Sequence, residues 1–206
     1  VAGYFNNWIS EFRANQNPFR EWATLFWHQH LPCGSRGQRT DINLEQIYLT
    51  WELYRRNALE SFRQLLIDYY QNPSSMYFLD IHRSYKQSPN ENFARELLEL
   101  YTLGPGNYSE KDVKEIARCF TGLHYENKDA YVQKAFRIDE QFDSGVKEIL
   151  GKQGNFYPED VFDIILGKRE CADFIARKAV FFFLGEGVSE GFPSECGKGY
   201  YESNYD

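Results

Sequence analysis

Long hydrophobic runs are missing from this sequence. The longest uninterrupted apolar stretch covers residues 179–184, whereas an α-helix needs roughly 20 apolar residues to cross a bilayer. The sequence therefore predicts no transmembrane segment. Hydrophobic residues make up 42% and charged residues 26% of the 206 positions, a balance that is typical of a folded globular protein and excludes a disordered chain.

Basic residues are too few for a nucleic-acid binding surface. The chain carries 23 Lys and Arg against 30 Asp and Glu, which gives a formal net charge of −7. Because proteins bind phosphate backbones through clusters of Lys and Arg, this acidic balance predicts no nucleic-acid partner.

Cysteines are also few, and they are widely separated. Cys33, Cys119, Cys171 and Cys196 form no Cys-x-x-Cys pair, which excludes zinc-ribbon and thioredoxin-like sites. Four separated cysteines allow three disulfide pairings or none, and the sequence does not choose among these states.

Aromatic residues are abundant. Phe, Tyr and Trp make up 17% of the chain, with 17 Phe and 15 Tyr. Aromatic side chains in this quantity either fill a large core or line a recognition surface, and core filling is the favoured interpretation.

Helical periodicity and capping signals cover most of the chain. Pro18 begins a helix after a polar break, Ser109 and Asp112 have the spacing of a capping box, and Gly104 ends a strongly periodic segment. The predicted helices cover approximately residues 4–15, 18–31, 43–57, 61–72, 75–81, 91–103, 109–122, 158–167 and 170–184.

The pattern changes after Gly122. Residues 131–138 alternate in part and residues 146–150 form a second short β-rich segment, so we expect a small hairpin-like insert. Residues 185–206 contain five glycines and little apolar periodicity, which predicts an extended or partly disordered tail. The predicted fold is mainly α, a single multi-helix domain over residues 1–184 with a small β insert after residue 122.

The histidines His28 and His30 suggest a metal site, but helical geometry opposes it. Residues two positions apart point about 200° away from each other on a helix, so the two imidazoles do not face one ion. His30 lies on the apolar stripe with Phe26, and His28 lies on the polar face. We interpret His30 as a buried, hydrogen-bonded histidine, with an acid–base or metal-ligand role as the alternative, and His28 as solvent-exposed.

A second candidate site lies on the helix predicted over residues 91–103. Asn92, Glu96 and Glu99 share one face of this helix. Paired carboxylates at this spacing bind divalent cations or divide acid and base roles between them. Arg95 and Glu99 nevertheless have the spacing of an ordinary helical ion pair, which favours a structural role.

A third group of charges lies on the next helix, where Glu115 and Arg118 project away from the apolar stripe. The short turn between the two helices predicts antiparallel packing. We therefore expect Arg95 and Glu99 to pair with Glu115 and Arg118, with at least one inter-helix contact between an arginine and a carboxylate partly buried. Such a network fixes helix geometry more surely than it performs catalysis.

Taken in order, these segments resemble the bacterial family called domain of unknown function 1800. The resemblance rests on Phe26-Trp27-x-x-His30, on the blocks from Asn90 to Gly104 and from Tyr108 to Gly122, and on Asp143, Gly145, Lys147, Leu150 and Gly151. The chain departs from the usual family pattern at Gln29, Leu31, Leu123 and Phe142.

The resemblance covers approximately residues 18–184 and implies a mainly helical fold. Family members are often longer than this chain, so the resemblance implies that residues 1–184 are a fragment of a longer domain. Members are also frequently exported, which implies a periplasmic, cell-surface or extracellular location. No established activity, substrate or cofactor accompanies the family.

Two functions are consistent with these observations. The favoured hypothesis is an export-associated or cell-envelope module that binds an exported partner protein or a glycan through an aromatic-rich surface. The alternative is a hydrolase-like or metal-dependent enzyme in which His30, Glu96 and Glu99 act as acid–base groups or ligands. Asn92, Arg95, Glu115 and Arg118 are further binding candidates. The first hypothesis is favoured because no nucleophile elbow, phosphate-binding glycine loop or His-Glu-x-x-His motif occurs.

Overall fold

The computed structural model describes residues 9–10, 12–14, 18–34, 44–125, 135–189 and 191–206. Helices account for 62% of the chain and strands form two small two-stranded sheets in the described ranges, so the predicted mainly α fold with a small β insert is confirmed. The α-helices are α2 (Pro18–His30), α3 (Leu44–Asn57), α4 (Phe62–Tyr70), α5 (Pro73–Phe78), α6 (Asn92–Glu96), α7 (Glu110–Cys119), α8 (Pro158–Leu166), α9 (Arg169–Leu184) and α10 (Phe192–Glu202). The helix predicted over residues 4–15 lies mostly outside the described residues.

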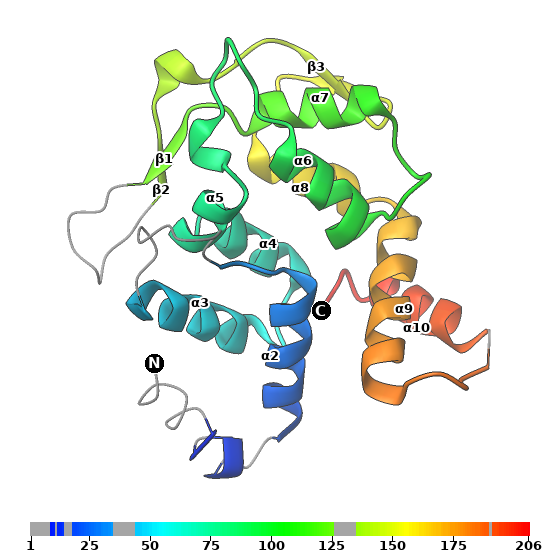
Figure 1. Cartoon of the computed structure of the whole chain (residues 1–206). Coiled ribbons are helices and arrows are strands. Elements are labelled where there is room, and N and C mark those ends of the chain that lie inside the picture. The colour runs from blue at the N-terminus through cyan, green and yellow to red at the C-terminus, as the bar shows by residue number, and fades with distance from the viewer. Residues whose placement is uncertain (1–8, 11, 15–17, 35–43, 126–134, 190) are drawn as a thin grey trace.

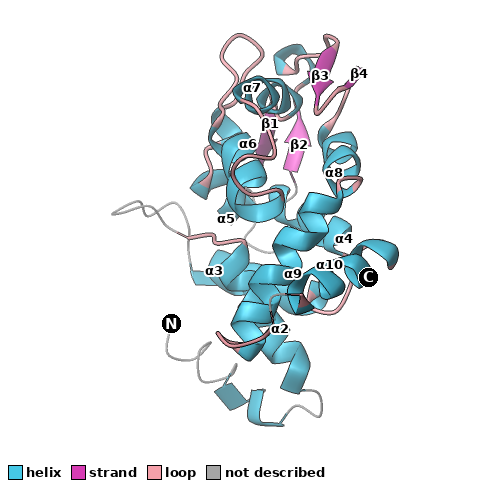
Figure 2. Cartoon of the chain, turned by 90° about the vertical axis from the view of Figure 1, so that its right-hand side faces the viewer, coloured by secondary structure: helices cyan, strands magenta, loops and turns pink. Residues whose placement is uncertain are grey.

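The helices are arranged around one core, with the β insert at one end. Figure 1 places α2 and α3 at the lower end, α6 and α7 at the upper end, and α4, α5 and α8 between them. Helices α9 and α10 lie side by side along one edge of the molecule, as both views show (Figure 2). Within the described ranges, no helix has both the length and the hydrophobicity that a membrane crossing requires.

The core is rich in aromatic side chains, as expected. The largest fully buried residues include Tyr54, Tyr69, Tyr101, Phe62, Phe120 and Phe162. Buried tyrosine hydroxyls need acceptors, and they find backbone carbonyls: the Tyr69 hydroxyl donates to Pro32 O at 2.7 Å, and the Tyr54 hydroxyl donates to Leu31 O. These bonds allow the rings to fill the core without leaving a buried hydroxyl unpaired.

The helix predicted over residues 91–103 changes its winding halfway. After α6 it continues as the π-helical segment η2 (Leu97–Thr102), in which the amides of Leu103 and Gly104 both donate to Leu98 O at 3.0 and 2.9 Å. A π-helical turn disturbs the regular ladder of hydrogen bonds and often lies at a functional position. Two carbonyls of this segment are contacted by side chains of other helices, as described below.

Gly104 ends this segment for two physical reasons. Its φ of 77° lies in the left-handed region, and a Cβ at this position would lie 2.8 Å from the Phe174 ring of α9. The glycine therefore allows the chain to turn and allows α9 to approach.

The β insert is real, but the predicted pairing of its strands is wrong. Strand β1 (Leu123–Tyr125) pairs with β2 (Ala135–Arg137), and β3 (Lys147–Ile149) pairs with β4 (Lys152–Gly154), each pair antiparallel. The second hairpin is tight because Leu150 and Gly151 both have positive φ, 49° and 84°. The two predicted segments, residues 131–138 and 146–150, therefore do not pair with each other, and each pairs with a different strand.

The prediction of an extended tail is wrong for the residues that form α10. Its glycines do not prevent a helix, because the helix packs against α9 and gains tertiary contacts. Gly197 faces α9 so closely that a Cβ would collide with Asp173. After α10, Tyr205 is only 1% exposed and its hydroxyl donates to Leu166 O at 2.9 Å.

No disulfide joins the four cysteines, all of which lie in the described part of the chain. Cys119 and Cys171 are buried, and burial raises the pKa of each thiol to about 12. Burial also raises the pKa of the Cys33 thiol to about 11, although the Tyr54 hydroxyl lies 3.2 Å from its sulfur and opposes the shift. These thiols are therefore in the protonated, weakly nucleophilic form near neutral pH.

Candidate functional site

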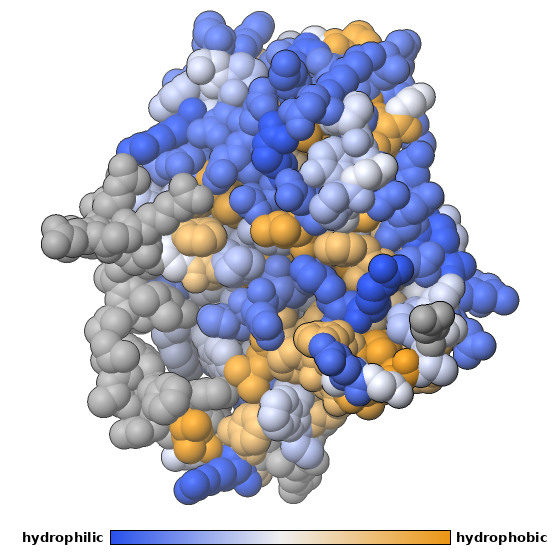
Figure 3. Space-filling model, turned by 45° about the vertical axis from the view of Figure 1, so that its right-hand side comes forward, coloured by the Kyte–Doolittle hydropathy of each residue, from blue (hydrophilic) through white to orange (hydrophobic). Residues whose placement is uncertain are grey.

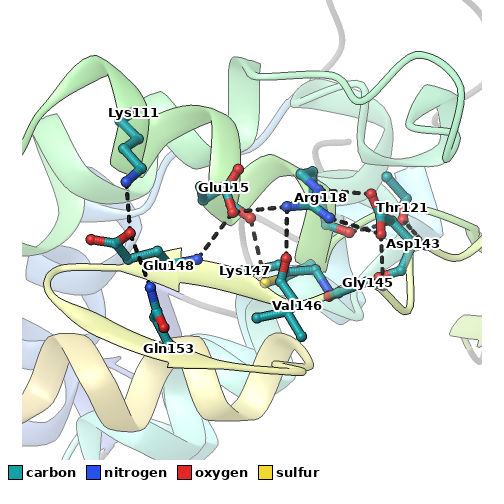
Figure 4. Close-up of polar contacts among 11 residues, drawn as sticks. Lys111, Glu115, Arg118, Thr121, Asp143, Gly145, Val146, Lys147, Glu148 and Gln153 are labelled. Atoms are coloured by element: carbon teal, nitrogen blue, oxygen red, sulfur yellow. Dashed lines mark hydrogen bonds and ion pairs between the residues drawn. The ribbon is translucent and has the colours of Figure 1, made fainter.

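Arg118 is the centre of a polar network between α7 and the β3–β4 hairpin (Figure 4). Its Nε and Nη2 donate to the two carboxylate oxygens of Asp143 at 2.7 and 3.1 Å, which is the bidentate geometry of a strong ion pair. Its Nη1 donates to Glu115 Oε2 at 2.8 Å and to Val146 O at 3.1 Å. All three nitrogens of the guanidinium are therefore occupied within the fold.

Lys147 completes this network from the strand side. The side chain is buried, and its ammonium donates to Asp143 O at 2.6 Å and to Gly145 O at 3.0 Å. Burial lowers the pKa of Lys147, while the charge of Asp143 opposes the shift. A Cβ at Gly145 would lie 2.8 Å from Arg118 Nη2, so a larger residue here would displace the end of the arginine side chain.

Two carboxylates of α7 bind the backbone of the same hairpin. Glu115 Oε2 accepts from the amide of Glu148 at 3.0 Å, and Asp112 Oδ1 accepts from the amide of Leu150 at 2.7 Å. Because the charged groups of this network bind one another or the backbone, the network can attach the hairpin to α7. We interpret Glu115 and Arg118 as structural on this ground.

The expected pairing of charges between α6 and α7 is wrong in detail. Arg95 does form an inter-helix contact, but its partner is Glu110, at 2.7 and 2.9 Å, and both side chains are exposed. Glu99 instead accepts from the Tyr108 hydroxyl at 3.2 Å. The carboxylate of α7 that meets Arg95 is Glu110, the first residue of the helix, whereas Glu115 and Arg118 bind the β3–β4 hairpin and the residues before it. Asn92, a further candidate, donates through Nδ2 to Leu79 O at 3.1 Å.

His30 is buried and hydrogen-bonded, as predicted. It is 5% exposed, its ring stacks on Phe26 at 5.6 Å, and its Nε2 lies 2.8 Å from Tyr101 O in η2. Burial, with a smaller contribution from the nearby Lys178 charge, lowers the pKa of His30 to about 3. The ring is therefore neutral at physiological pH. His28 is exposed, also as predicted.

The glutamates of the enzyme hypothesis do not line the hollow beside His30. That hollow has walls from α2 and α9, and neither Glu96 nor Glu99 is among them. In the described part of the chain, no three His, Cys, Asp or Glu side chains come together as metal ligands would. The catalytic role of these three residues stays a prediction.

An apolar groove lies between α2, α9 and α10. It has a volume of about 460 Å³ and is lined by Phe19, Ala23, Phe26, Trp27, Ala58, Leu59, Ile175, Ala176, Ala179, Val180, Phe183, Leu184, Phe192, Cys196 and Tyr200. Several of these side chains are exposed, including Leu184 at 58% and Phe19 at 55%. Figure 3 shows apolar surface gathered over the lower half of this face, where Figure 1 places these helices.

Sequence reasoning missed the cations beside this surface. Arg177 and Lys178 lie on α9, directly before its apolar residues. The Lys178 ammonium lies 3.4 Å from Nδ1 of His30. Two adjacent basic residues just before the apolar run at residues 179–184 were the available signal.

The fold and these contacts define a mainly α-helical domain whose polar motif residues bind a small β hairpin to a helix. The chain belongs to the protein family of unknown function DUF1800, whose model matches residues 2–206. No curated protein and no solved structure shows significant similarity to it.

The Asp143 carboxylate makes the hairpin contact sensitive to acid. The hydrogen bonds from Arg118 hold the pKa of Asp143 below its ordinary value of 3.8. Because this pKa is lower in the folded than in the unfolded state, the stabilisation is present at neutral pH and is lost as the pH falls from about 5 through the folded-state value. We expect the free energy of unfolding to fall more between pH 6 and pH 3 in the parent than in Asp143→Asn, because only the parent loses this stabilisation on protonation. Urea unfolding at each pH measures the free energy of unfolding of both proteins. If the two free energies changed equally with pH, the prediction would be contradicted.

Proposed function

We propose that this protein is a binding module of the cell envelope that holds an apolar segment of a partner protein in the apolar groove. The observation that carries this proposal is the groove itself, an open hollow with an almost entirely hydrocarbon wall. Phe183, Leu184 and Phe192 stand 36%, 58% and 37% exposed along it. Contiguous exposed apolar surface is costly in water and is typical of interaction sites.

The chemistry of the wall favours a protein segment over a glycan. A sugar presents many hydroxyls, so its site needs several polar groups that donate and accept hydrogen bonds. The groove wall offers the polar groups of Cys196 and Tyr200, together with Trp27, whose Nε1 already donates to Ala58 O at 3.1 Å. An amphipathic helix that lays its apolar face into the groove between the helices matches this surface better.

The envelope location of this module rests on the family. Its members are frequently exported, and the partner of an exported module is expected to be exported as well. Fractionation of the cells that make the protein tests this part separately. Recovery of the protein in the soluble cytoplasmic fraction alone would contradict it, whatever the groove binds.

The enzyme alternative has less support. The imidazole of His30 is held by the Tyr101 carbonyl, and the hollow beside it contains neither proposed glutamate. A general base must reach the proton that it abstracts, so an acid–base role for His30 together with Glu96 and Glu99 requires a rearrangement of η2.

A photo-crosslinking amino acid at position 184 tests the groove in living cells. Leu184 is exposed in the groove wall, so the substitution leaves the core intact. The matched control carries the crosslinker at Lys114, an exposed position on α7 at the other end of the molecule. We expect a discrete crosslinked protein with the Leu184 derivative and none with the Lys114 derivative.

A second variant shows whether the contact is apolar. Leu184→Asp places a charge in the groove wall, and we expect it to reduce recovery of the same partner by at least tenfold in a pull-down, because a charge is costly to bury against hydrocarbon. Equal labelling from both crosslinker positions, or undiminished recovery with Leu184→Asp, would overturn the proposal.

A further inference from the structure

A second hollow lies on the other side of the contact between α2 and α9. This α2–α9 hollow has a volume of about 520 Å³, within the range of roughly 300–1,000 Å³ that small-molecule sites occupy. Phe26, Phe181 and Phe182 supply aromatic walls, and Arg177 and Lys178 supply two positive charges. The hollow therefore combines an apolar wall with a cationic edge, unlike the apolar groove.

The Lys178 ammonium is held in place by neutral acceptors. It donates to Leu100 O of η2 at 2.8 Å and lies 3.4 Å from Nδ1 of His30. The Tyr101 carbonyl can only accept, so the neutral His30 ring carries its proton on Nε2 and presents the Nδ1 lone pair to Lys178. The Phe174 ring centroid lies 4.9 Å from the ammonium. The π-helical carbonyl and the buried histidine thus orient one lysine at the edge of the hollow.

The charge of this lysine is not neutralised within the described part of the chain. No described carboxylate forms an ion pair with Lys178 or with Arg177, although acidic residues outnumber basic ones in the whole sequence. An ammonium has three N–H donors, and two of those on Lys178 are directed at Leu100 O and His30. Burial lowers the pKa of Lys178, because the charged form is partly removed from water.

We propose that the α2–α9 hollow binds a small amphipathic carboxylate, with the carboxylate on Lys178 and Arg177 and the alkyl or aromatic body against Phe26, Phe181 and Phe182. An anion there supplies the missing counter-charge, and the hydrogen bond to a charged lysine in a partly desolvated hollow is stronger than one in water. The apolar body gains free energy from leaving water, so both halves of the ligand contribute.

Calorimetric titration with octanoate, and with octanol as its uncharged counterpart, tests this proposal. We expect the parent protein to bind octanoate at least tenfold more tightly than octanol. Lys178→Gln should weaken octanoate binding by at least tenfold and leave octanol binding unchanged. Arg177→Gln, at an exposed position, should weaken octanoate binding less. The control Lys114→Gln removes the same charge from α7 and should change neither affinity.

The pH dependence and a groove variant separate this site from the apolar groove. Octanoate binding should weaken as the pH rises through the lowered pKa of Lys178, whereas octanol binding should not change. Leu184→Asp, which alters the groove, should leave octanoate binding intact. Equal affinity for octanoate and octanol would overturn the proposal. Octanoate binding that is lost in Leu184→Asp and kept in Lys178→Gln would overturn it too. Neither outcome would affect the proposed function.

Discussion

Replacement of Tyr205 by alanine is expected to lower the free energy of unfolding by about 4 kcal/mol, because it removes a buried aromatic side chain. The Tyr205 side chain is 1% exposed, and its ring packs edge-on against Tyr200 at 5.0 Å and lies 6.4 Å from Phe62. Its carbonyl also accepts from the Phe62 amide at 3.1 Å, at the beginning of α4. Alanine removes the ring and leaves a cavity between α4 and α10.

Tyr205→Phe is the matched control for this prediction. It keeps the ring and removes only the hydroxyl that donates to Leu166 O, so we expect a loss of about 1 kcal/mol. Urea unfolding followed by circular dichroism measures both variants. If Tyr205→Ala lost less than about 1 kcal/mol, the segment after α10 would be detached from the core in solution and the ring would contribute little.

Replacement of Arg118 by alanine is expected to cost about 3 kcal/mol, because it leaves two carboxylates without their cation. The side chains of Asp143 and Glu115 are only 14% and 21% exposed, so water solvates their unpaired charges poorly. The bond to Val146 O is lost in the same variant, so the hairpin loses one of its attachments to α7. We expect hydrogen exchange to increase in β3 and β4 before it increases in the helical core.

Arg95→Ala is the control for Arg118→Ala. Arg95 also forms a bidentate contact with a glutamate, Glu110, but the two side chains are 38% and 68% exposed. Water and salt screen an exposed ion pair, so we expect the free energy of unfolding of this variant to lie close to that of the parent. Equal losses for the two arginines would show that burial does not distinguish the two contacts. Full stability of Arg118→Ala would show that the network serves another purpose than attaching the hairpin.

Helices were the most predictable part of this protein, because their signals are local. Asn72 caps α5 by accepting from the Ser74 amide, and Ser109 and Asp112 form the predicted capping box at the beginning of α7. The apolar stripe of α7, which includes Val113 and Ile116, is fully buried. Each of these features depends on residues a few positions apart, so one sequence contains all the information.

Strand pairing and the C-terminal helix were less predictable. A three-residue strand such as β2 is too short for a clear alternating pattern. Its pairing with β1 depends on the close approach of the chain at Gly122, where φ is 73° and a Cβ would lie 2.8 Å from Ile138 O. Helix α10 has glycines that disfavour a helix locally, and its packing on α9 overrides them.

The candidate sites divide in the same way. The sequence by itself determined the mainly α fold, the family and the burial of His30, because periodicity and motif spacing are properties of neighbouring residues. Only the tertiary structure decided that Arg118 binds Asp143 across 25 residues, and that Lys178 meets His30 across 148. The packing of whole helices brings together residues that are so distant in the chain. Local sequence patterns do not predict the free energy of that packing.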